Sequence, residues 1–345
     1  MIKILSIGQF SALGVSNTCL HRNWALHELG DVTDIDSTKI EGFFDRLRRF
    51  LYVRFALPIH FYNPGLNKII RRAVASTPFD VVWIDKGVYI NGSTLKFIKE
   101  RQPKCKLIGY SPDNMAERHN QSQNFLDGLK YYDYYVTTKS YIITDLKRIG
   151  ARDVIFVNNA YEPKFHKPYV LTKSEKERLG GKIGFIGSWE SERCKSILYL
   201  AKRGLPVRVW GDSQWAKYSG LYPNLIIEPR GLFSEDYNKA LSAFDISLCF
   251  LRKMNFDLQT TRTMEIPACG SMLVAERTAE HEALFKDRKE AVFFSSNEEL
   301  YDLCKYYLAH EYERKIIANE GHRRCIEAGY SNKEMIRSVL MKVLG

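Results

Sequence analysis

A chain of 345 residues is too long for one typical hydrophobic core, because such cores stop growing at roughly 250 to 300 residues, so two domains are expected. Hydrophobic residues at 45% and charged residues at 26% exclude a disordered or fibrous chain. The net charge of +11 favours an anionic partner, such as nucleic acid, a phosphorylated ligand or an acidic membrane face.

Cysteine usage and apolar run length indicate the compartment. The seven cysteines are scattered and never spaced as C-x-x-C, which argues against a disulfide framework and a structural zinc site. The N-terminal run MIKILSIG is short and carries Lys3, so it predicts a first strand and not a signal peptide. No stretch approaches the roughly 20 apolar residues that span a bilayer. We expect a cytoplasmic protein, or one peripheral at the inner face of the membrane.

Short β-branched and aromatic runs recur along the chain, with spacers of helix length between them. In chain order they cover residues 3–8, 32–36, 80–87, 106–111, 133–139 and 153–159, and then 182–188, 207–213, 225–230, 245–250, 272–277 and 291–296. Near-continuous apolar strands that alternate with helices indicate parallel sheets covered on both faces. The two sets predict an α/β protein with two doubly wound, Rossmann-like domains.

The stretch between the two sets is the best candidate for a linker. Residues 158–181 hold two prolines and then a charged stretch that ends in two glycines. We predict a first domain at 1–168 and a second at 169–345, with the last helix a candidate to pack back on the first domain. Within the second domain, 296–308 predicts a helix that begins after Ser296 and buries one apolar face.

Ligands of doubly wound domains bind at the carboxyl ends of the strands, so site residues are expected in the loops there. After the first strand, Gly14 belongs to a loop that enters a helix, and a helix N-terminus suits an anion. A flexible turn explains this loop equally well. After a later strand, the loop 110–125 gathers Asp113, His119 and other polar groups, and Asp85 ends the neighbouring strand. A polar turn that caps the next helix is the alternative.

Two patterns argue against a resident cofactor. The first loop lacks the G-x-G-x-x-G spacing of dinucleotide-binding domains, although Asp36 ends the second strand where a ribose-binding acid would lie. Asp34 and Asp36 form a D-x-D pair, but the nearby positions offer no third ligand. Neither NAD nor a metal ion is expected.

The second set of strands opens with a candidate phosphate site. After the strand 182–188, Gly187 and Ser188 lead into a helix that carries Arg193 and Lys195. Cations beside a helix N-terminus reinforce the binding of a phosphate. At least one of the two is alternatively a solvated surface charge.

A second polar loop follows the strand 245–250. It contains Asp257 and ends at Arg262, Thr263 and Glu265, where the next helix begins. Because this loop also leaves the carboxyl end of a strand, its polar groups are candidates for the same ligand.

The motif R-T-x-E-I-P-A-C-G-S at 262–271 is followed by E-x-x-x-L-F, F-F-S-S-x-E-E-L and Y-L-A-H. With these motifs, residues 245–330 resemble the group 1-like donor domain of GT-B glycosyltransferases. The first half, with Y-S-P-D-N-M, H-N-x-S and T-T-K, is similar to a bacterial branch related to CgeB-like spore maturation proteins. The resemblance covers nearly the whole chain. It implies a GT-B fold, in which an acceptor domain and a nucleotide-sugar donor domain face a central cleft.

The resemblance also implies roles for single residues. Many retaining GT-B enzymes have an E-x7-E motif whose second glutamate binds the ribose of the donor, and Glu265 matches that glutamate. Asp257 stands where the first glutamate is usual. Arg262, with Arg193 or Lys195, matches the cations that neutralise the leaving diphosphate. A retaining mechanism is slightly favoured.

An inverting mechanism would need a base for the acceptor hydroxyl. Asp113 is the first candidate for that base and His119 the second. A retaining enzyme would need no such base.

The implied function is metal-independent transfer of a sugar from a nucleotide sugar to a hydroxyl of a glycan or lipid-linked acceptor, in the synthesis of bacterial surface glycans or glycoconjugates. Such transfer develops positive charge on the sugar and negative charge on the diphosphate. The alternative is a non-catalytic protein that binds a nucleotide or nucleic acid. Nucleic acid is not expected, because no RRM, KH, zinc-finger or helix-turn-helix signature is present.

Residues 41–62 mix phenylalanines with four arginines between the second and third strands. Such a basic, aromatic, amphipathic stretch suits an anionic membrane surface. A helix that covers the sheet and turns a basic face to solvent is an equal alternative, and the basic net charge tips the prediction toward membrane contact.

Overall fold

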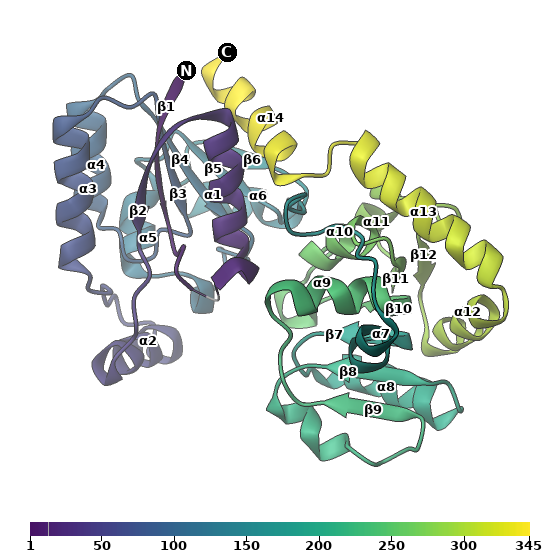
Figure 1. Cartoon of the computed structure of the whole chain (residues 1–345). Coiled ribbons are helices and arrows are strands. Elements are labelled where there is room, and N and C mark those ends of the chain that lie inside the picture. The colour runs from purple at the N-terminus through teal and green to yellow at the C-terminus, as the bar shows by residue number, and fades with distance from the viewer. Residues whose placement is uncertain (13) are drawn as a thin grey trace. The chain divides into compact units, whose positions relative to one another are not determined.

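The computed structural model describes residues 1–12 and 14–345, and the chain forms two compact units (Figure 1). Unit 1 holds Met1–Asn158 together with Asn332–Gly345, and unit 2 holds Asn159–Ser331. Each unit contains one six-stranded sheet whose paired strands run parallel. Each predicted run overlaps one of these strands, which confirms the expected α/β class.

The sheet of unit 1 has the order β2-β1-β3-β4-β5-β6. Its strands are β1 (Ile2–Gly8), β2 (Gly30–Asp36), β3 (Val81–Asp85), β4 (Lys106–Ser111), β5 (Tyr134–Thr137) and β6 (Val154–Phe156). Every residue of β3 is buried, as expected for a strand covered on both faces. Because β1 pairs with β2 on one side and with β3 on the other, the switch point of this sheet lies between β1 and β3.

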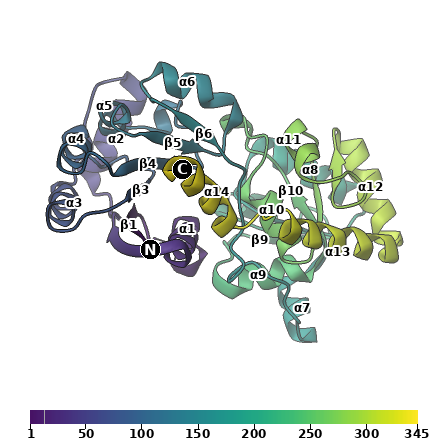
Figure 2. The same cartoon turned by 90° about the horizontal axis from the view of Figure 1, so that it is seen from above.

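The helices of unit 1 include the C-terminal segment of the chain. They are α1 (Thr18–Leu29), α2 (Phe43–Phe55), α3 (Pro64–Ser76), α4 (Gly92–Arg101), α5 (Gln123–Leu129), α6 (Ile143–Arg148) and α14 (Asn332–Leu344). Figures 1 and 2 show α14 alongside α1, and Lys333 of α14 pairs with Glu28 of α1 at 2.9 Å. Helix α2 is 13 residues long, yet only its Tyr52 is buried.

The sheet of unit 2 has the order β12-β11-β10-β7-β8-β9. Its strands are β7 (Gly181–Ile186), β8 (Val207–Trp210), β9 (Leu225–Glu228), β10 (Phe244–Cys249), β11 (Met272–Glu276) and β12 (Val292–Phe294). Its helices are α7 (Lys173–Leu179), α8 (Ser191–Lys202), α9 (Ser234–Ala243), α10 (Thr261–Ala268), α11 (Ala279–Leu284), α12 (Asn297–Ala309) and α13 (Glu311–Glu327). The first strand, β7, pairs with β8 and with β10, so the switch point lies between β7 and β10.

Helix α12 forms where the sequence predicts it. The Ser296 hydroxyl accepts a hydrogen bond from the backbone N–H of Glu299 at 3.1 Å and caps the helix. The predicted apolar face is buried, with Leu300, Leu303, Cys304 and Tyr307 in the core of unit 2.

Residues 159–168, which composition placed in the first domain, lie in unit 2. The backbone N–H of Asn159 donates to the side-chain oxygen of Gln259 at 2.9 Å, and Tyr161 forms a β-bridge with Ser331. Residue composition marks a flexible stretch but not the body on which it packs. These partners lie 100 or more residues further along the chain, so the sequence pattern could not show them.

Candidate functional site

The switch point of unit 2 lies between β7 and β10, and ligands of doubly wound sheets bind at the carboxyl ends of the strands there. From β7 the chain continues through Gly187, which is half-buried, and the exposed Ser188 into α8. From β10 it continues through a polar loop into α10. Most of the predicted site residues of unit 2 therefore lie on segments that leave this edge of the sheet.

Arg193 of α8 connects the two strand ends. Its Nη1 donates to the carbonyl oxygen of Ser188 at 3.2 Å, and its Nη2 lies 3.5 Å from the carbonyl oxygen of Phe250. The side chain is buried, and its Nε has no hydrogen-bond partner among the described residues. Burial lowers the pKa of Arg193, because the charged guanidinium loses its hydration. An anion at this edge would restore favourable interactions for that group.

Arg262 approaches the end of β7 from α10. Its Nε donates to the carbonyl oxygen of Ile186 at 3.3 Å, and its Nη1 donates to Oε2 of Glu265 at 2.9 Å. The guanidinium lies 5.0 Å from the ring centroid of Tyr237, and a third of the side chain stays exposed. Burial opposes the charge, but Tyr237 and Glu265 together raise the pKa of Arg262. Arg262 therefore keeps its charge and part of its surface for a ligand.

Glu265 is buried, at 2% exposure, inside a polar network. Its Oε2 accepts a hydrogen bond from the hydroxyl of Tyr237 at 2.5 Å, beside the bond from Arg262. Its Oε1 lies 3.5 Å from Nε2 of His166. The backbone N–H of Glu162 donates to Nδ1 of His166 at 3.0 Å, so the neutral ring carries its proton on Nε2 and turns it toward the carboxylate.

Tyr237 and His166 have no counterpart among the residues that the sequence singled out. Tyr237 belongs to the buried face of α9, where a tyrosine is indistinguishable from an ordinary core residue. His166 lies in the stretch that composition marks as a linker. Only the packing of these segments against α10 shows that both residues orient Glu265.

A third arginine belongs to the same edge. Arg252, which follows β10, places its Nε 2.9 Å from Oε1 of Glu190, and the same carboxylate oxygen lies 3.6 Å from Nη1 of Arg193. The charges of Arg252 and Arg262 both act on Arg193 and contribute to its lowered pKa. Three guanidinium groups thus gather around the ends of β7 and β10, an arrangement that suits a phosphorylated ligand.

Thr263 fixes the start of α10. It is fully buried, and its hydroxyl accepts the backbone N–H of Thr260 at 3.1 Å. The Nδ1 of His281 donates to the carbonyl oxygen of Glu276 at 2.7 Å, so its Nε2 accepts from the Thr263 hydroxyl at 2.9 Å. Burial lowers the pKa of His281. The lowered pKa favours the neutral ring, in which Nε2 accepts the hydrogen bond from Thr263. In this structure Thr263 contributes to the site by fixing the backbone at the start of α10.

Lys195 and Asp257 have different surroundings. Lys195 is exposed on α8 and pairs with Glu192 at 2.6 Å, as the solvated-charge alternative predicts. Asp257 is only 8% exposed, and its backbone N–H donates to the carbonyl oxygen of Arg252 at 3.3 Å. Asp257 therefore shares a turn with a member of the arginine group.

The remaining predicted residues belong to unit 1. Asp113 pairs with Lys86 at 2.6 Å, and about a third of each side chain is exposed. His119 is exposed, and its Nε2 lies 3.2 Å from Nδ2 of Asn120. Gly14 is exposed and has a φ of +55° in a 3₁₀ turn that precedes α1, a conformation that favours glycine.

The loop 110–125 uses several of its polar groups within the fold. The hydroxyl of Ser122 donates to the carbonyl oxygen of Val88 and accepts the backbone N–H of Phe125, so it caps α5. Asn114 accepts the backbone N–H of Ala116 in a local turn. The turn-and-cap alternative holds for these two residues.

A buried ion pair lies at the switch point of unit 1. Arg22 of α1 contacts Asp85 at two points, with Nε 2.7 Å from Oδ2 and Nη2 3.1 Å from Oδ1. The guanidinium lies 4.3 Å from the ring centroid of Tyr110. Asp85, which the sequence placed at a strand end beside the polar loop 110–125, therefore forms an ion pair with Arg22, 63 residues away in the chain.

The aspartates considered for a metal have other partners. Asp34 contacts His27 at 2.9 Å, and Asp36 accepts hydrogen bonds from the backbone N–H groups of Phe10 and Thr38. Within residues 1–12 and 14–345, no group of three or more His, Cys, Asp and Glu side chains is placed to hold a metal ion.

The part of the chain that contains this edge is similar to a known family. Residues 193–340 match the family model described as Glycosyl transferase-like. The matched region includes Arg193, Arg262 and Glu265. No curated protein sequence matches the chain significantly.

Solved structures resemble the whole chain at low sequence identity. HepE of Anabaena in complex with UDP-glucose is 14% identical, with 99% of this chain and 100% of that chain covered and a TM-score of 0.63. Sucrose-phosphate synthase from Thermosynechococcus elongatus is 12% identical, with 100% and 99% covered and a TM-score of 0.67. A glycosyltransferase from Rickettsia africae is 14% identical, with 99% and 97% covered and a TM-score of 0.63.

These likenesses show the fold. The fold is GT-B. The expected class, with two doubly wound α/β domains, is confirmed.

Proposed function

We propose that the chain is a glycosyltransferase that moves a sugar from a nucleotide-diphosphate sugar to a hydroxyl of an acceptor. The observation that carries the proposal is the convergence of Arg193, Arg262 and Glu265 at the switch point of unit 2, inside the region similar to Glycosyl transferase-like proteins. HepE has been solved with UDP-glucose and with UDP, which supports a nucleotide sugar as the donor.

The arginines would stabilise the leaving group. As the bond to the sugar breaks, negative charge grows on the departing diphosphate. Arg193 and Arg262 are held by backbone carbonyl oxygens at the end of β7, so their charges are in place before the reaction begins. Two positioned guanidinium groups can neutralise a diphosphate by forming charge-assisted hydrogen bonds. We therefore propose a transfer that needs no metal ion.

Glu265 would bind the ribose of the donor. A carboxylate can accept about four hydrogen bonds, so the contacts with Tyr237, Arg262 and His166 orient the group and are compatible with a ribose diol. Because the charged carboxylate is buried, its hydrogen bonds to sugar hydroxyls would be strong.

We propose retention of the anomeric configuration. The support is the spacing of Asp257 and Glu265, eight residues apart as in the E-x7-E motif that the chain resembles. Asp257 is one methylene shorter than the usual glutamate, so it would hold the sugar from a greater distance. An inverting mechanism would instead use Asp113 or His119 as the base. The anomeric configuration of the first product, read by NMR, distinguishes the two.

The acceptor we propose is a glycan or a lipid-linked sugar, in the synthesis of a bacterial surface glycan or glycoconjugate. The support is the resemblance to the bacterial branch related to CgeB-like spore maturation proteins. A cytoplasmic location agrees with seven cysteines that are all buried, free thiols.

The test is a panel of nucleotides and nucleotide sugars on the purified chain. We expect UDP, GDP or TDP to raise the melting temperature, and one nucleotide sugar to be hydrolysed slowly without an acceptor. The Arg262→Ala variant should lose both responses, because it lacks a diphosphate ligand. Binding without hydrolysis or transfer would favour a non-catalytic nucleotide-binding protein, and a full panel with neither response would refute the enzyme.

A further inference from the structure

Helix α2 carries large apolar side chains on the outside of unit 1. The exposed fractions of Phe43, Phe44 and Phe50 are 73%, 72% and 56%. We use the name α2 surface for the exposed apolar and basic residues of this region, which are Phe43, Phe44, Leu47, Phe50, Val53, Phe55, Leu57, Arg46, Arg48 and Arg54. Monomeric proteins rarely leave so many neighbouring aromatic side chains in water, so such a surface marks an interaction site.

One side of α2 is attached to unit 1. Tyr52, its buried residue, packs edge-on against Phe61 with 5.7 Å between ring centroids. Arg49 pairs with Glu41 and donates to the hydroxyl of Tyr89 at 3.3 Å. These contacts hold the helix in one orientation, so the exposed side chains are not the result of a detached segment.

The helical period separates the attached side from the apolar side. Phe43, Leu47 and Phe50 follow one another at spacings of four and three residues, so they share one face of the helix. Tyr52 follows Phe43 by nine residues, and at about 100° per residue this places it on the opposite face. The apolar stripe therefore lies opposite the attachment, which is the reverse of a helix that covers its own core.

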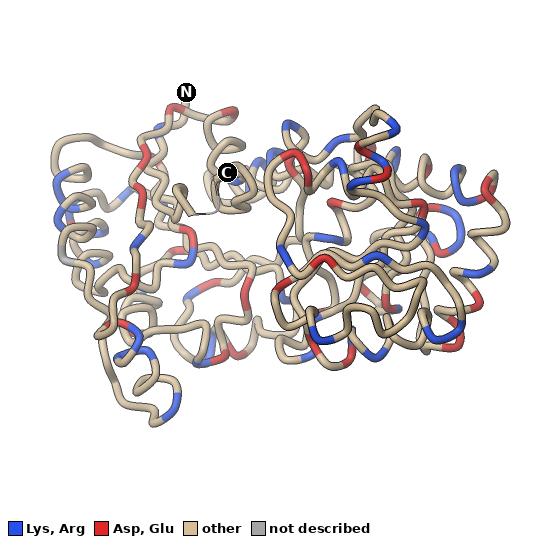
Figure 3. The backbone as a smooth tube through the Cα atoms, turned by 60° about the horizontal axis from the view of Figure 1, so that its bottom comes forward, with Lys and Arg blue, Asp and Glu red and all other residues tan. Residues whose placement is uncertain are grey.

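Basic residues accompany the apolar stripe. Four arginines and one aspartate lie within α2, and Figure 3 shows the basic positions along this helix. Arg49 is used in the attachment, whereas Arg46, Arg48 and Arg54 are exposed. Two copies of this surface facing each other would bring like charges together. An anionic surface would be attracted instead.

We propose that the α2 surface binds the anionic face of a lipid bilayer, with α2 lying in the plane of the interface. The phenylalanines would enter the boundary between headgroups and acyl chains, and the arginines would contact lipid phosphates. With 13 residues, α2 is about 20 Å long and cannot cross a hydrocarbon core of about 30 Å. None of the helices formed by the described residues is long and apolar enough to cross a membrane.

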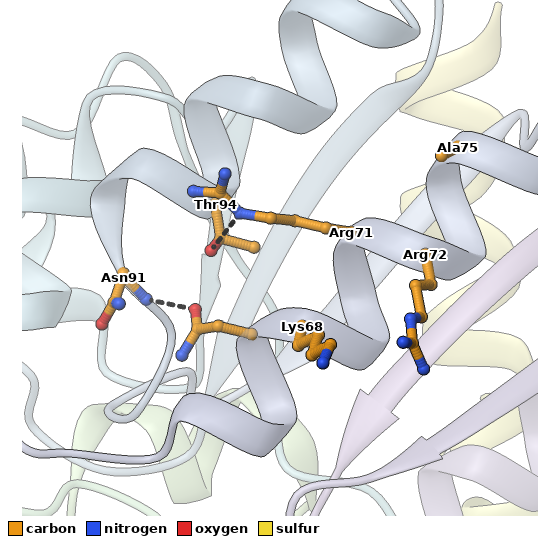
Figure 4. Close-up of a pocket in the computed structure, with 7 residues that line it drawn as sticks. Lys68, Arg71, Arg72, Ala75, Asn91 and Thr94 are labelled. Carbon is orange, nitrogen blue, oxygen red and sulfur yellow. Dashed lines mark hydrogen bonds between the residues drawn. The ribbon is translucent and has the colours of Figure 1, made fainter.

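A second basic area on unit 1 provides a matched control. A groove of about 460 Å³ between α3 and α4 is bordered by Lys68, Arg71 and Arg72 (Figure 4). Arg71 reaches across to Thr94, with its Nε 3.3 Å from the hydroxyl oxygen, so it is used within the fold. Lys68 and Arg72 are exposed, as is Arg101 of α4, and no large aromatic side chain lines this groove. These three cations carry the same charge as those of the α2 surface but lack its apolar stripe.

The test is co-sedimentation of the full chain with vesicles of phosphatidylcholine alone or of equal parts phosphatidylcholine and phosphatidylglycerol. We expect binding to the anionic vesicles only, with weaker binding as salt is added. Phe43→Ser/Phe44→Ser/Phe50→Ser should bind at least roughly tenfold more weakly, because the apolar contacts are lost. The charge variant Arg46→Gln/Arg48→Gln/Arg54→Gln should lose roughly 10- to 100-fold, and melting temperatures should stay unchanged because these side chains are exposed.

Two matched variants serve as controls. Lys68→Gln/Arg72→Gln/Arg101→Gln removes the same charge, and Ile226→Ser/Phe233→Ser/Tyr312→Ser removes apolar side chains of unit 2 that are 51%, 53% and 79% exposed. Both should bind like the unchanged chain.

Three outcomes would overturn the proposal. They are no binding to anionic vesicles, equal losses in the control variants, and an α2 surface found buried between two copies of the chain in solution. Vesicle binding needs neither a donor nor transfer, so its failure leaves the proposed sugar transfer untouched, and the converse also holds.

Discussion

Replacing Glu265 with alanine should cost stability as well as nucleotide affinity. The side chain is 3% exposed and receives hydrogen bonds from Arg262 at 2.9 Å and from Tyr237 at 2.5 Å. Losing a hydrogen bond between charged groups costs about 1.5–3 kcal/mol, and a buried hydroxyl without an acceptor costs about 1–3 kcal/mol. Since a third of Arg262 is exposed, water replaces part of the lost ion pair. We expect the free energy of unfolding to fall by about 3 kcal/mol.

The glutamine variant separates the two effects. Glu265→Gln keeps the volume and an acceptor for Tyr237, so the loss of stability should be about 1 kcal/mol. It removes the negative charge, which should weaken UDP binding roughly tenfold, because hydrogen bonds from ribose hydroxyls to a neutral amide are weaker. Alanine should weaken binding at least as much.

The assays are urea unfolding followed by circular dichroism, and titration calorimetry with UDP. A double-mutant cycle of Arg262→Ala and Glu265→Ala should give a coupling energy of about 1–2 kcal/mol, as expected for two groups in direct contact. If Glu265→Ala unfolds within about 0.5 kcal/mol of the unchanged chain, the network does not stabilise unit 2. If Glu265→Gln binds UDP with undiminished affinity, the carboxylate does not bind ribose.

Three further predictions test neighbouring parts of the structure. Arg193→Gln should weaken UDP binding roughly 10- to 100-fold, measured by calorimetry, whereas Lys195→Gln should leave it unchanged; equal losses would contradict the different placement of the two cations. Asp85→Ala should lower the free energy of unfolding by about 3–5 kcal/mol in urea, because it leaves the buried guanidinium of Arg22 without its counter-ion, and a loss under about 1 kcal/mol would refute this role. The pKa of His281 is lowered from 6.5 by burial, so the unfolded chain binds more protons, and this stabilising contribution is present above about pH 6.5 and lost as the pH falls further. The drop in melting temperature from about pH 7.5 to about pH 5.5 should therefore be smaller in His281→Gln, and an equal drop would contradict the assignment.

The strands could be predicted because their signal is local. A parallel strand in a doubly wound sheet is buried on both faces, so its residues form a continuous apolar run such as that of β3. The cap of α12 is local as well, since Ser296 and Glu299 lie within one turn. Such features depend only on residues that are close in the chain, so a single sequence is enough to predict them.

The role of residues 41–62 could not be decided from their pattern. A helix that covers a sheet and a helix that faces a membrane can both have one apolar face and one basic face. The structure separates them, because Tyr52 is the buried residue of α2 while Phe43, Phe44 and Phe50 are exposed. The orientation of the helix depends on its attachment through Arg49 and Tyr52, and the attaching partners are Glu41, Phe61 and Tyr89.

The candidate site divides in the same way. Arg193, Arg262 and Glu265 could be proposed because each follows a predicted strand, and the strands of a doubly wound sheet end at one edge. The sequence could not predict the exposure of these residues or their partners. It also could not predict that Arg193 and Lys195 have different surroundings. Neighbouring positions on a helix point in different directions, so one cation is buried against the strand ends while the other pairs with Glu192 in solvent.

By itself the sequence determined the two α/β sets, the strands, the loops that meet the switch point of unit 2 and the residues in those loops. Only the tertiary structure decided that His166 and Tyr237, from residues 159–168 and from α9, contact Glu265. It also decided that α14 packs as part of unit 1. Periodicity records which side of an element is buried, but not which distant element buries it. Long-range contacts depend on the packing of the whole chain, and that information becomes visible only when the chain is folded.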